Sequence, residues 1–182
     1  MKNSLLLLTV LIFSLKSFSQ DSKISLEVNY PIPLGDNFIG KSYDGIADIG
    51  IDYKFFNKSL FNVGASLNGG VFLNNSFDNI TTTAYTIQPR VFTELKVLSK
   101  IRPSLGIGYT IIVFNISGDS NLETPSTESG LNLNLGITYD ITKKIFAQVQ
   151  YDFSSLSTSD DVPDISFNTQ IQLLKIGVGY RL

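Results

Sequence analysis

Alternation between apolar and polar residues, with a period of two, is the feature that most constrains how this chain can fold. Successive side chains of a β-strand point to opposite faces, so an alternating stretch predicts a strand with one apolar and one polar face. In residues 174–182 every even-numbered residue is apolar, and every odd-numbered residue is Lys, Gly or Arg. Eight such segments of about ten residues occur, at residues 24–32, 47–55, 61–71, 85–96, 101–111, 131–139, 145–153 and 174–182.

The connections between these segments alternate in length. Residues 56–59, 97–100 and 140–144 form short connections, whereas residues 33–44, 73–83, 114–129 and 154–166 form longer ones. Short turns at one end and longer loops at the other are typical of a transmembrane β-barrel. The pattern predicts an all-β fold, an eight-stranded antiparallel up-and-down barrel with both chain ends on the short-turn side. In an exported chain, that side would face the periplasm.

The first residues have the three parts of a secretory signal peptide. A short basic head precedes an apolar run from Leu5 to Leu15, and small residues, Ser17 and Ser19, stand three and one positions before a cleavage site after residue 19. The run is too short to span a bilayer as a helix. We therefore expect residues 1–19 to be a cleaved signal peptide and residues 20–182 to form the barrel, an uncleaved anchor being the alternative.

Composition excludes several classes of function. The chain has no cysteine and no histidine, so it lacks disulfides, thiolate metal ligands and the commonest general base. Its formal net charge of −2 gives no electrostatic footprint for nucleic acid. We expect no catalytic residues, no metal site and no cofactor.

The distribution of glycine and tyrosine indicates which face is outside. Glycine is concentrated on the polar face, where it would make room for large side chains in a narrow lumen. Seven tyrosines lie on the apolar face towards segment ends, which is the placement of aromatic girdles at the two membrane interfaces. A soluble lipocalin-like barrel that binds an apolar ligand remains the alternative. The expected girdle consists of Tyr30, Tyr53, Tyr85, Tyr109, Tyr139, Tyr151 and Tyr180.

With the apolar face against lipid, the charged residues of the polar faces point into the lumen. Buried charges must pair, so these residues are expected to form an internal salt-bridge network, mainly in the half nearer the short turns. Such a network either stabilises a filled barrel or forms a narrow ion path. The predicted members are Glu27, Asp48, Asp52, Arg90, Glu94, Lys96, Arg102, Asp152, Lys175 and Arg181.

Two places depart from the pattern. Pro89 lies within an alternating segment and cannot donate to a strand ladder, so we expect a bulge or a local break there. Residues 167–173 are apolar at odd numbers, whereas residues 174–182 are apolar at even numbers. Either a bulge reverses the register, or the last strand begins near Gln172.

The closing segment carries a family resemblance. Its alternating apolar residues, its aromatic Tyr180 two places from the end and its terminal apolar Leu182 resemble the C-terminal signal of bacterial outer-membrane β-barrels, which usually ends in Phe. By topology and length, the mature chain resembles small barrels of the OmpA membrane-domain and OmpX type. The resemblance implies the outer membrane of a diderm bacterium, contact with its lipid, assembly by the barrel assembly machinery through the C-terminal strand, and an extracellular partner that the loops could bind.

The family resemblance leaves several roles open. The first is a non-enzymatic structural or surface-interaction role with a side-chain-filled lumen, and the second is a narrow channel or small-solute porin. Lipid-modifying enzymes with this fold resemble hydrolases that use a His with a Ser and an acid, and this chain has no histidine. We therefore expect no enzyme.

Overall fold

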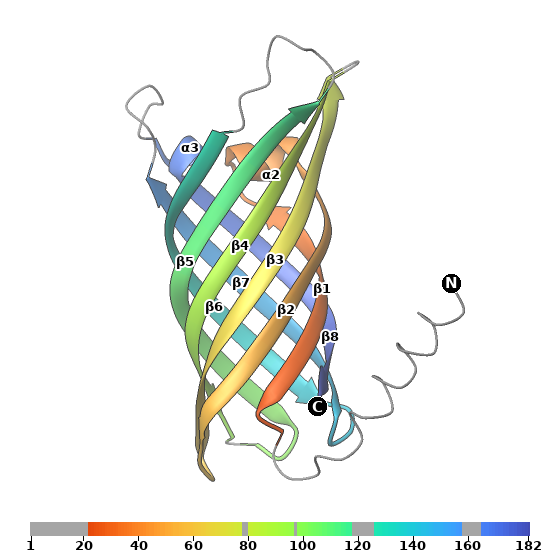
Figure 1. Ribbon diagram of the computed structural model, residues 1–182, viewed down its shortest axis with the longest axis vertical. Coiled ribbons are helices and arrows are strands. Elements are labelled where there is room, and N and C mark those ends of the chain that lie inside the picture. Colours follow the sequence, from red (N-terminus) through yellow and green to blue (C-terminus); the bar gives the residue numbers. More distant parts are fainter. Residues whose placement is uncertain (1–21, 78–79, 97, 118–125, 158–164) are drawn as a thin grey trace, which may run out of the picture.

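The computed structural model describes residues 22–77, 80–96, 98–117, 126–157 and 165–182, so the predicted signal peptide at residues 1–19 lies outside the described residues. The fold is a closed barrel of eight antiparallel strands, each paired with its neighbours in sequence and the first paired with the last (Figure 1). The predicted fold class is confirmed. The strands are β1 (Ile24–Leu34), β2 (Asp44–Asn57), β3 (Phe61–Phe77), β4 (Ile80–Leu95), β5 (Ile101–Ser117), β6 (Ser126–Asp140), β7 (Ile145–Ser157) and β8 (Gln170–Arg181).

Two short helices lie together at one end of the barrel, which we call the loop end (Figure 1). They are α2 (Phe38–Ser42), between β1 and β2, and α3 (Ser166–Thr169), before β8. The opposite end, called the turn end, carries the short connections at residues 58–60, 96–100 and 141–144 and the pairing of Ser25 with Arg181. Among the described residues, no helix is both long enough and apolar enough to cross a membrane.

The two faces of the barrel have opposite polarity. Large aliphatic side chains point outward, among them Leu131 at 66% exposed and Ile49 at 62%. Polar and charged side chains such as Gln88 and Lys175, each 0% exposed, point inward. This arrangement suits a barrel that is surrounded by acyl chains. The alternative of a soluble lipocalin-like barrel is wrong, because that fold would place its apolar face inside.

The strands are longer at the loop end than the sequence pattern indicated. Most of the predicted loop at 73–83 belongs to β3 and β4, and β5 and β7 continue to Ser117 and Ser157. The inner face becomes apolar at this end, as at Phe72 and Ile112. In β5 both faces are then apolar at residues 111–114, whereas residues 81–83 of β4 are all Thr. Neither stretch shows the alternation that marks a strand in the sequence, although the hydrogen-bonded ladder continues.

The β2–β3 ladder contains two register shifts, between Gly45 and Ala47 and between Lys54 and Phe56. The second shift leaves Phe55 and Phe56 both exposed on the outer face, because a bulge adds a residue without reversing the rest of the strand. Lys54 accordingly points inward and is buried.

The two places that depart from the alternating pattern, Pro89 and residues 167–173, have different explanations in the structure. At Pro89 the β4–β5 ladder skips Gln88 and Pro89 but keeps one register on either side, so the local break is present and the bulge is not. In β8 the register against β1 and β7 is constant, so the predicted register-reversing bulge is wrong. The strand begins at Gln170, close to the other expected start.

Candidate functional site in the barrel lumen

The inward-facing side chains form layers that change in character from the loop end to the turn end. β8 passes through all of them, since each odd-numbered residue from Ile171 to Arg181 faces the interior. Its inward residues are apolar at Ile171 and Leu173, cationic at Lys175, glycine at two positions, and cationic again at Arg181. The lumen is therefore best described layer by layer.

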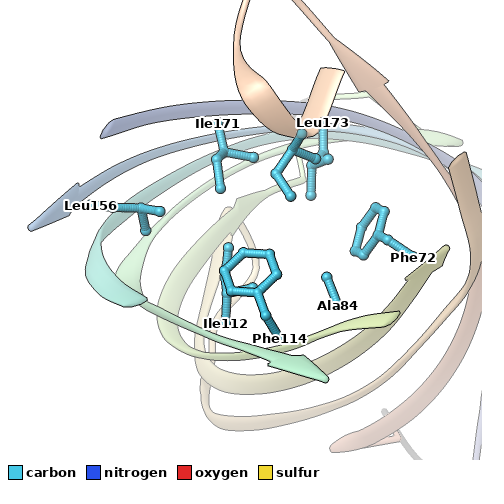
Figure 2. Packing of buried hydrophobic residues seen from close by; sticks show 8 residues of the cluster. Phe72, Ala84, Ile112, Phe114, Leu156, Ile171 and Leu173 are labelled. Carbon is cyan, nitrogen blue, oxygen red and sulfur yellow. The ribbon is translucent and has the colours of Figure 1, made fainter. Parts of the chain in front are cut away.

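An apolar plug fills the loop end. Side chains from five strands converge on the barrel axis there (Figure 2). Ile39, the buried residue of α2, belongs to the same cluster. Phe38 and Tyr43 pack against the plug, and their rings and the Phe114 ring lie 5.5–6.3 Å apart. Burial raises the pKa of the Tyr43 hydroxyl. The plug consists of Ile39, Phe72, Ala84, Ile112, Phe114, Leu156, Ile171 and Leu173.

The α2 helix is held in place by its own local sequence. The Asn37 side chain caps it by accepting a 2.8 Å hydrogen bond from the backbone N–H of Gly40. The same side chain donates to the carbonyl of Leu34 at the end of β1. Gly35 has a φ of 85°, a left-handed conformation that glycine adopts without strain. The turn and cap together direct α2 back over the lumen.

Below the plug lies the central ion cluster, which consists of Asp48, Arg90, Asp152 and Lys175. The Nζ atom of Lys175 lies 2.8 Å from Asp48 Oδ2, 2.9 Å from Asp152 Oδ2 and 2.7 Å from Gln88 Oε1. Arg90 Nη1 lies 2.9 Å from Asp152 Oδ1. All four charged side chains are at least nine-tenths buried, so each charge depends on its partners for stabilisation.

A layer of amides surrounds Glu27 at mid-barrel. Its carboxylate accepts hydrogen bonds from the amide nitrogens of Asn68, Gln148 and Gln150. An internal cavity of about 40 Å³, also lined by Asp52, lies at this level. A space of this size and polarity is large enough for a few water molecules.

The turn-end ion chain runs across the barrel with alternating sign. It consists of Lys54, Glu94, Arg102, Asp140 and Arg181, from five different strands. Lys54 Nζ is 3.0 Å from Glu94 Oε1, and Arg102 Nη1 is 3.4 Å from the same oxygen. Arg102 Nη2 and Arg181 Nη2 each lie 2.6 Å from an Asp140 oxygen.

Outside this chain the barrel opens into a vestibule of about 690 Å³ at the turn end. Three cations of the turn-end ion chain and the lysines Lys96, Lys100, Lys143 and Lys144 line it. Lys96, just beyond β4, donates hydrogen bonds to the Asn57 side chain and the Lys58 carbonyl.

The ten predicted lumen residues therefore separate into several groups. Four make up the central ion cluster, and three, Glu94, Arg102 and Arg181, join the turn-end ion chain. Glu27 is bound by amides, Asp52 lines the small cavity, and Lys96 lines the vestibule. Sequence reasoning missed Lys54 and Asp140 as members. Lys54 was on the correct face, and Asp140 was assigned to a turn although it ends β6.

The seven predicted girdle tyrosines lie on the outer face. Six are 38–55% exposed, and Tyr151, less exposed, donates a 3.0 Å hydrogen bond to Gln172. Tyr139 and Tyr180 pair with the first residues of β5 and β7, at the turn end. There the Nζ atoms of Lys100 and Lys144 lie 5.9 and 5.4 Å from the centroids of these two rings.

Within the described ranges, no group of three or more His, Cys, Asp or Glu residues is arranged to hold a metal ion. The lumen chemistry consists of packed apolar groups, paired ions and amides.

Comparison with known proteins agrees with this architecture. The family model described as "Outer membrane protein beta-barrel domain" matches residues 5–181. Neisserial surface protein A is similar in structure, with a TM-score of 0.64, 14% identity, and coverage of 87% of this chain and 96% of that one. Ail, the attachment invasion locus protein of Yersinia pestis, has a TM-score of 0.60, 11% identity, and coverage of 90% and 100%.

A second structure of Ail, in complex with the heparin analogue sucrose octasulfate, gives a TM-score of 0.61 at 14% identity, with coverage of 88% and 97%. A comparison with the curated proteins finds no match. Identities this low show the fold alone, whereas the family model spans nearly the whole sequence. The chain therefore belongs to the outer membrane protein beta-barrel domain family, and it is an integral outer-membrane β-barrel protein.

Proposed function

We propose that this barrel is sealed and non-enzymatic, and that it acts at the cell surface through its loop end. The observation that carries the proposal is the filled lumen. The apolar plug, the central ion cluster and the turn-end ion chain follow one another along the axis, and the cavity found at mid-barrel among the described residues has a volume of about 40 Å³. An eight-stranded barrel has an interior about wide enough for its own side chains, which agrees with this filling.

Export and orientation follow from the sequence. Residues 1–19 would direct the chain across the inner membrane, and the barrel would stand with its turn end in the periplasm and its loop end outside. The C-terminal strand continues its hydrogen bonding to the last residue, as the backbone N–H of Leu182 donates to Ile24 O at 3.1 Å. This fully engaged terminus supports β8 as the segment that the barrel assembly machinery would recognise.

The loop end would carry the interaction surface. Helix α2 covers the plug there, and Ile165, at the N-terminus of α3, and Phe167, within α3, are exposed apolar residues. Ail has been crystallised with a heparin analogue, so barrels of this shape can bind external ligands. Lipid of the outer membrane is the surrounding contact.

A narrow channel is the second candidate. The charged lumen and the wide vestibule favour it, because ions in a pore are stabilised by fixed charges and amide oxygens. Against it stands the apolar plug, which leaves a permeating ion without polar partners at the loop end.

Recordings of the purified protein in planar bilayers test the seal. We expect no stepwise conductance from the native barrel. The matched variant is Phe72→Ala with Leu173→Ala, which opens the plug while leaving the ion clusters intact. Regular unitary steps from the native protein would contradict the sealed barrel and support a channel.

The absence of histidine supports the non-enzymatic part of the proposal, because the lipid hydrolases of this fold resemble enzymes that need it. Incubation of the protein with lipopolysaccharide and phospholipid, followed by mass spectrometry of the lipids, tests this part. We expect unchanged lipids, and release of a fatty acid by the native protein would overturn it.

A further inference from the structure

The vestibule at the turn end is a concave space of about 690 Å³, and its charge is strongly one-sided. Besides Lys54, Arg102, Asp140 and Arg181 of the turn-end ion chain, Lys100, Lys143 and Lys144 line it. None of these three ammonium groups lies within ion-pair distance of a carboxylate among the described residues. Even when the C-terminal carboxylate of Leu182 is counted, cations outnumber anions around this space.

Arg181 on the floor of the vestibule is only partly satisfied. Its Nη2 atom is bound by Asp140, whereas Nε and Nη1 are buried and have no hydrogen-bond partner among the described residues. The side chain is 7% exposed. The guanidinium stacks on the ring of Phe146, with 4.6 Å between Cζ and the ring centroid, and this contact fixes its plane.

We propose that the vestibule binds a phosphate-bearing anion. A fixed guanidinium with unused N–H donors suits the oxygens of a phosphate, and lysines around it supply point charges. A volume of about 690 Å³ is in the range of small-molecule sites and exceeds what one phosphate group needs. The ligand is thus a polyphosphorylated solute or a phospholipid headgroup.

The position of the lysines leaves both sources of phosphate within reach. The ammonium groups of Lys100 and Lys144 lie over Tyr139 and Tyr180, which are on the outer, lipid-facing surface, and both lysine residues also line the vestibule. The same cations can therefore contact a headgroup at the membrane interface or an anion that enters the vestibule from solution.

Isothermal titration of the micelle-bound barrel with inorganic pyrophosphate tests the site. Lys143→Gln with Lys144→Gln removes two vestibule charges from an exposed turn. Lys23→Gln with Lys58→Gln is the matched control, because it removes two exposed charges near the same end, outside the vestibule. We expect roughly tenfold weaker binding for the first pair, equivalent to about 1.4 kcal/mol, and a change below about twofold for the control.

Equal weakening by both pairs would show non-specific attraction to a basic barrel end and would overturn the proposal, as would the absence of pyrophosphate binding by the native protein. Heat-dependent gel migration of each variant checks that the barrel is folded.

Nanodiscs of defined lipid composition then distinguish whether the phosphate bound in the vestibule belongs to a lipid headgroup or to a soluble anion. In discs of phosphatidylcholine alone, the native protein should bind pyrophosphate. If phosphatidylglycerol in the disc abolishes that binding, a lipid headgroup occupies the vestibule, and if binding persists, the ligand is a soluble anion. Failure to bind in phosphatidylcholine discs would contradict the proposal.

Discussion

The apolar plug and the central ion cluster lie next to each other in the same lumen, and they fill it by different means. The plug packs eight apolar side chains and needs no directed contacts. The cluster holds two cations and two carboxylates in contact, where every charge requires a partner. Lipid requires an apolar outer face over the band of the barrel that the bilayer covers. The interior only has to be filled, with every buried polar group paired. Its side chains can therefore change from apolar to charged between Leu173 and Lys175.

The ion cluster is therefore expected to be less tolerant of a single change than the plug. Lys175→Met keeps an unbranched side chain of similar length but leaves Asp48 and Asp152 without their shared cation. We expect a loss of about 3–5 kcal/mol in the free energy of unfolding, because breaking a buried pair leaves an uncompensated charge. Urea unfolding in micelles measures this loss. Unfolding is followed by the near-ultraviolet signal of tyrosine, since the chain has no tryptophan, and by gel migration.

A second substitution tests the cause. Asp152 keeps Arg90 as a partner, whereas Asp48 has no other cation within ion-pair distance among the described residues. Adding Asp48→Asn to Lys175→Met should thus recover at least half of the lost stability. If Lys175→Met costs less than about 1 kcal/mol, the value for an exposed pair, the cluster does not have the buried character described above.

The plug is expected to respond to lost volume. Leu173→Ala, one inward position from Lys175, should lower the free energy of unfolding by about 2–5 kcal/mol through lost burial and a residual cavity. Leu173→Met, which nearly conserves volume, should cost less than about 1.5 kcal/mol. Urea titrations of the two variants measure the difference. Equal losses would mean that the shape of the plug, and not its volume, determines its contribution.

The contrast between the two regions also explains what the sequence could predict. The ion cluster lies where polar and apolar residues alternate, so strand, face and charge could all be read from residues such as Asp152 and Lys175. The plug lies where inward residues are apolar too. Residues 111–114, Ile-Ile-Val-Phe, have no alternation, and the predicted strand ended there although β5 continues.

Which charges meet could not be read from the sequence. Arg90 and Asp152 are far apart in the chain, and their contact depends on barrel closure and on the stagger of four strands. Lys54 and Asp140 were missed as members of the turn-end ion chain. Lys54 lies beside the β2 bulge; its period placed it on the polar face, but it was left out of the predicted network. Asp140 is the last residue of β6, where the alternating pattern ends, and it was assigned to a turn.

The inward-facing layer at the turn end is also closely packed, and Gly179 shows how little space is left there. A Cβ on Gly179 would overlap the ring of Phe146, the same ring on which Arg181 stacks. Gly179→Ala should therefore cost about 1–3 kcal/mol by overpacking. Gly106→Ala is the matched control, since a Cβ there makes only ordinary contacts, the nearest at 3.4 Å. Thermal unfolding of both variants checks the difference, and equal melting temperatures would show that the turn-end layer is loosely packed.

The smallest effect is expected for an ion pair that lies outside the lumen. Lys41 Nζ is 3.0 Å from Asp36 Oδ1 at the loop end, but the two side chains are 60% and 87% exposed. Water and salt screen such a pair, so Lys41→Met should change the free energy of unfolding by no more than about 1 kcal/mol. Urea titrations at low and high salt, beside Lys175→Met, measure both. The exposed pair should lose its small contribution in high salt while the Lys175 effect persists, because the buried cluster is out of reach of mobile ions. A salt-sensitive Lys175 effect would mean that water and ions enter the lumen as far as the central ion cluster.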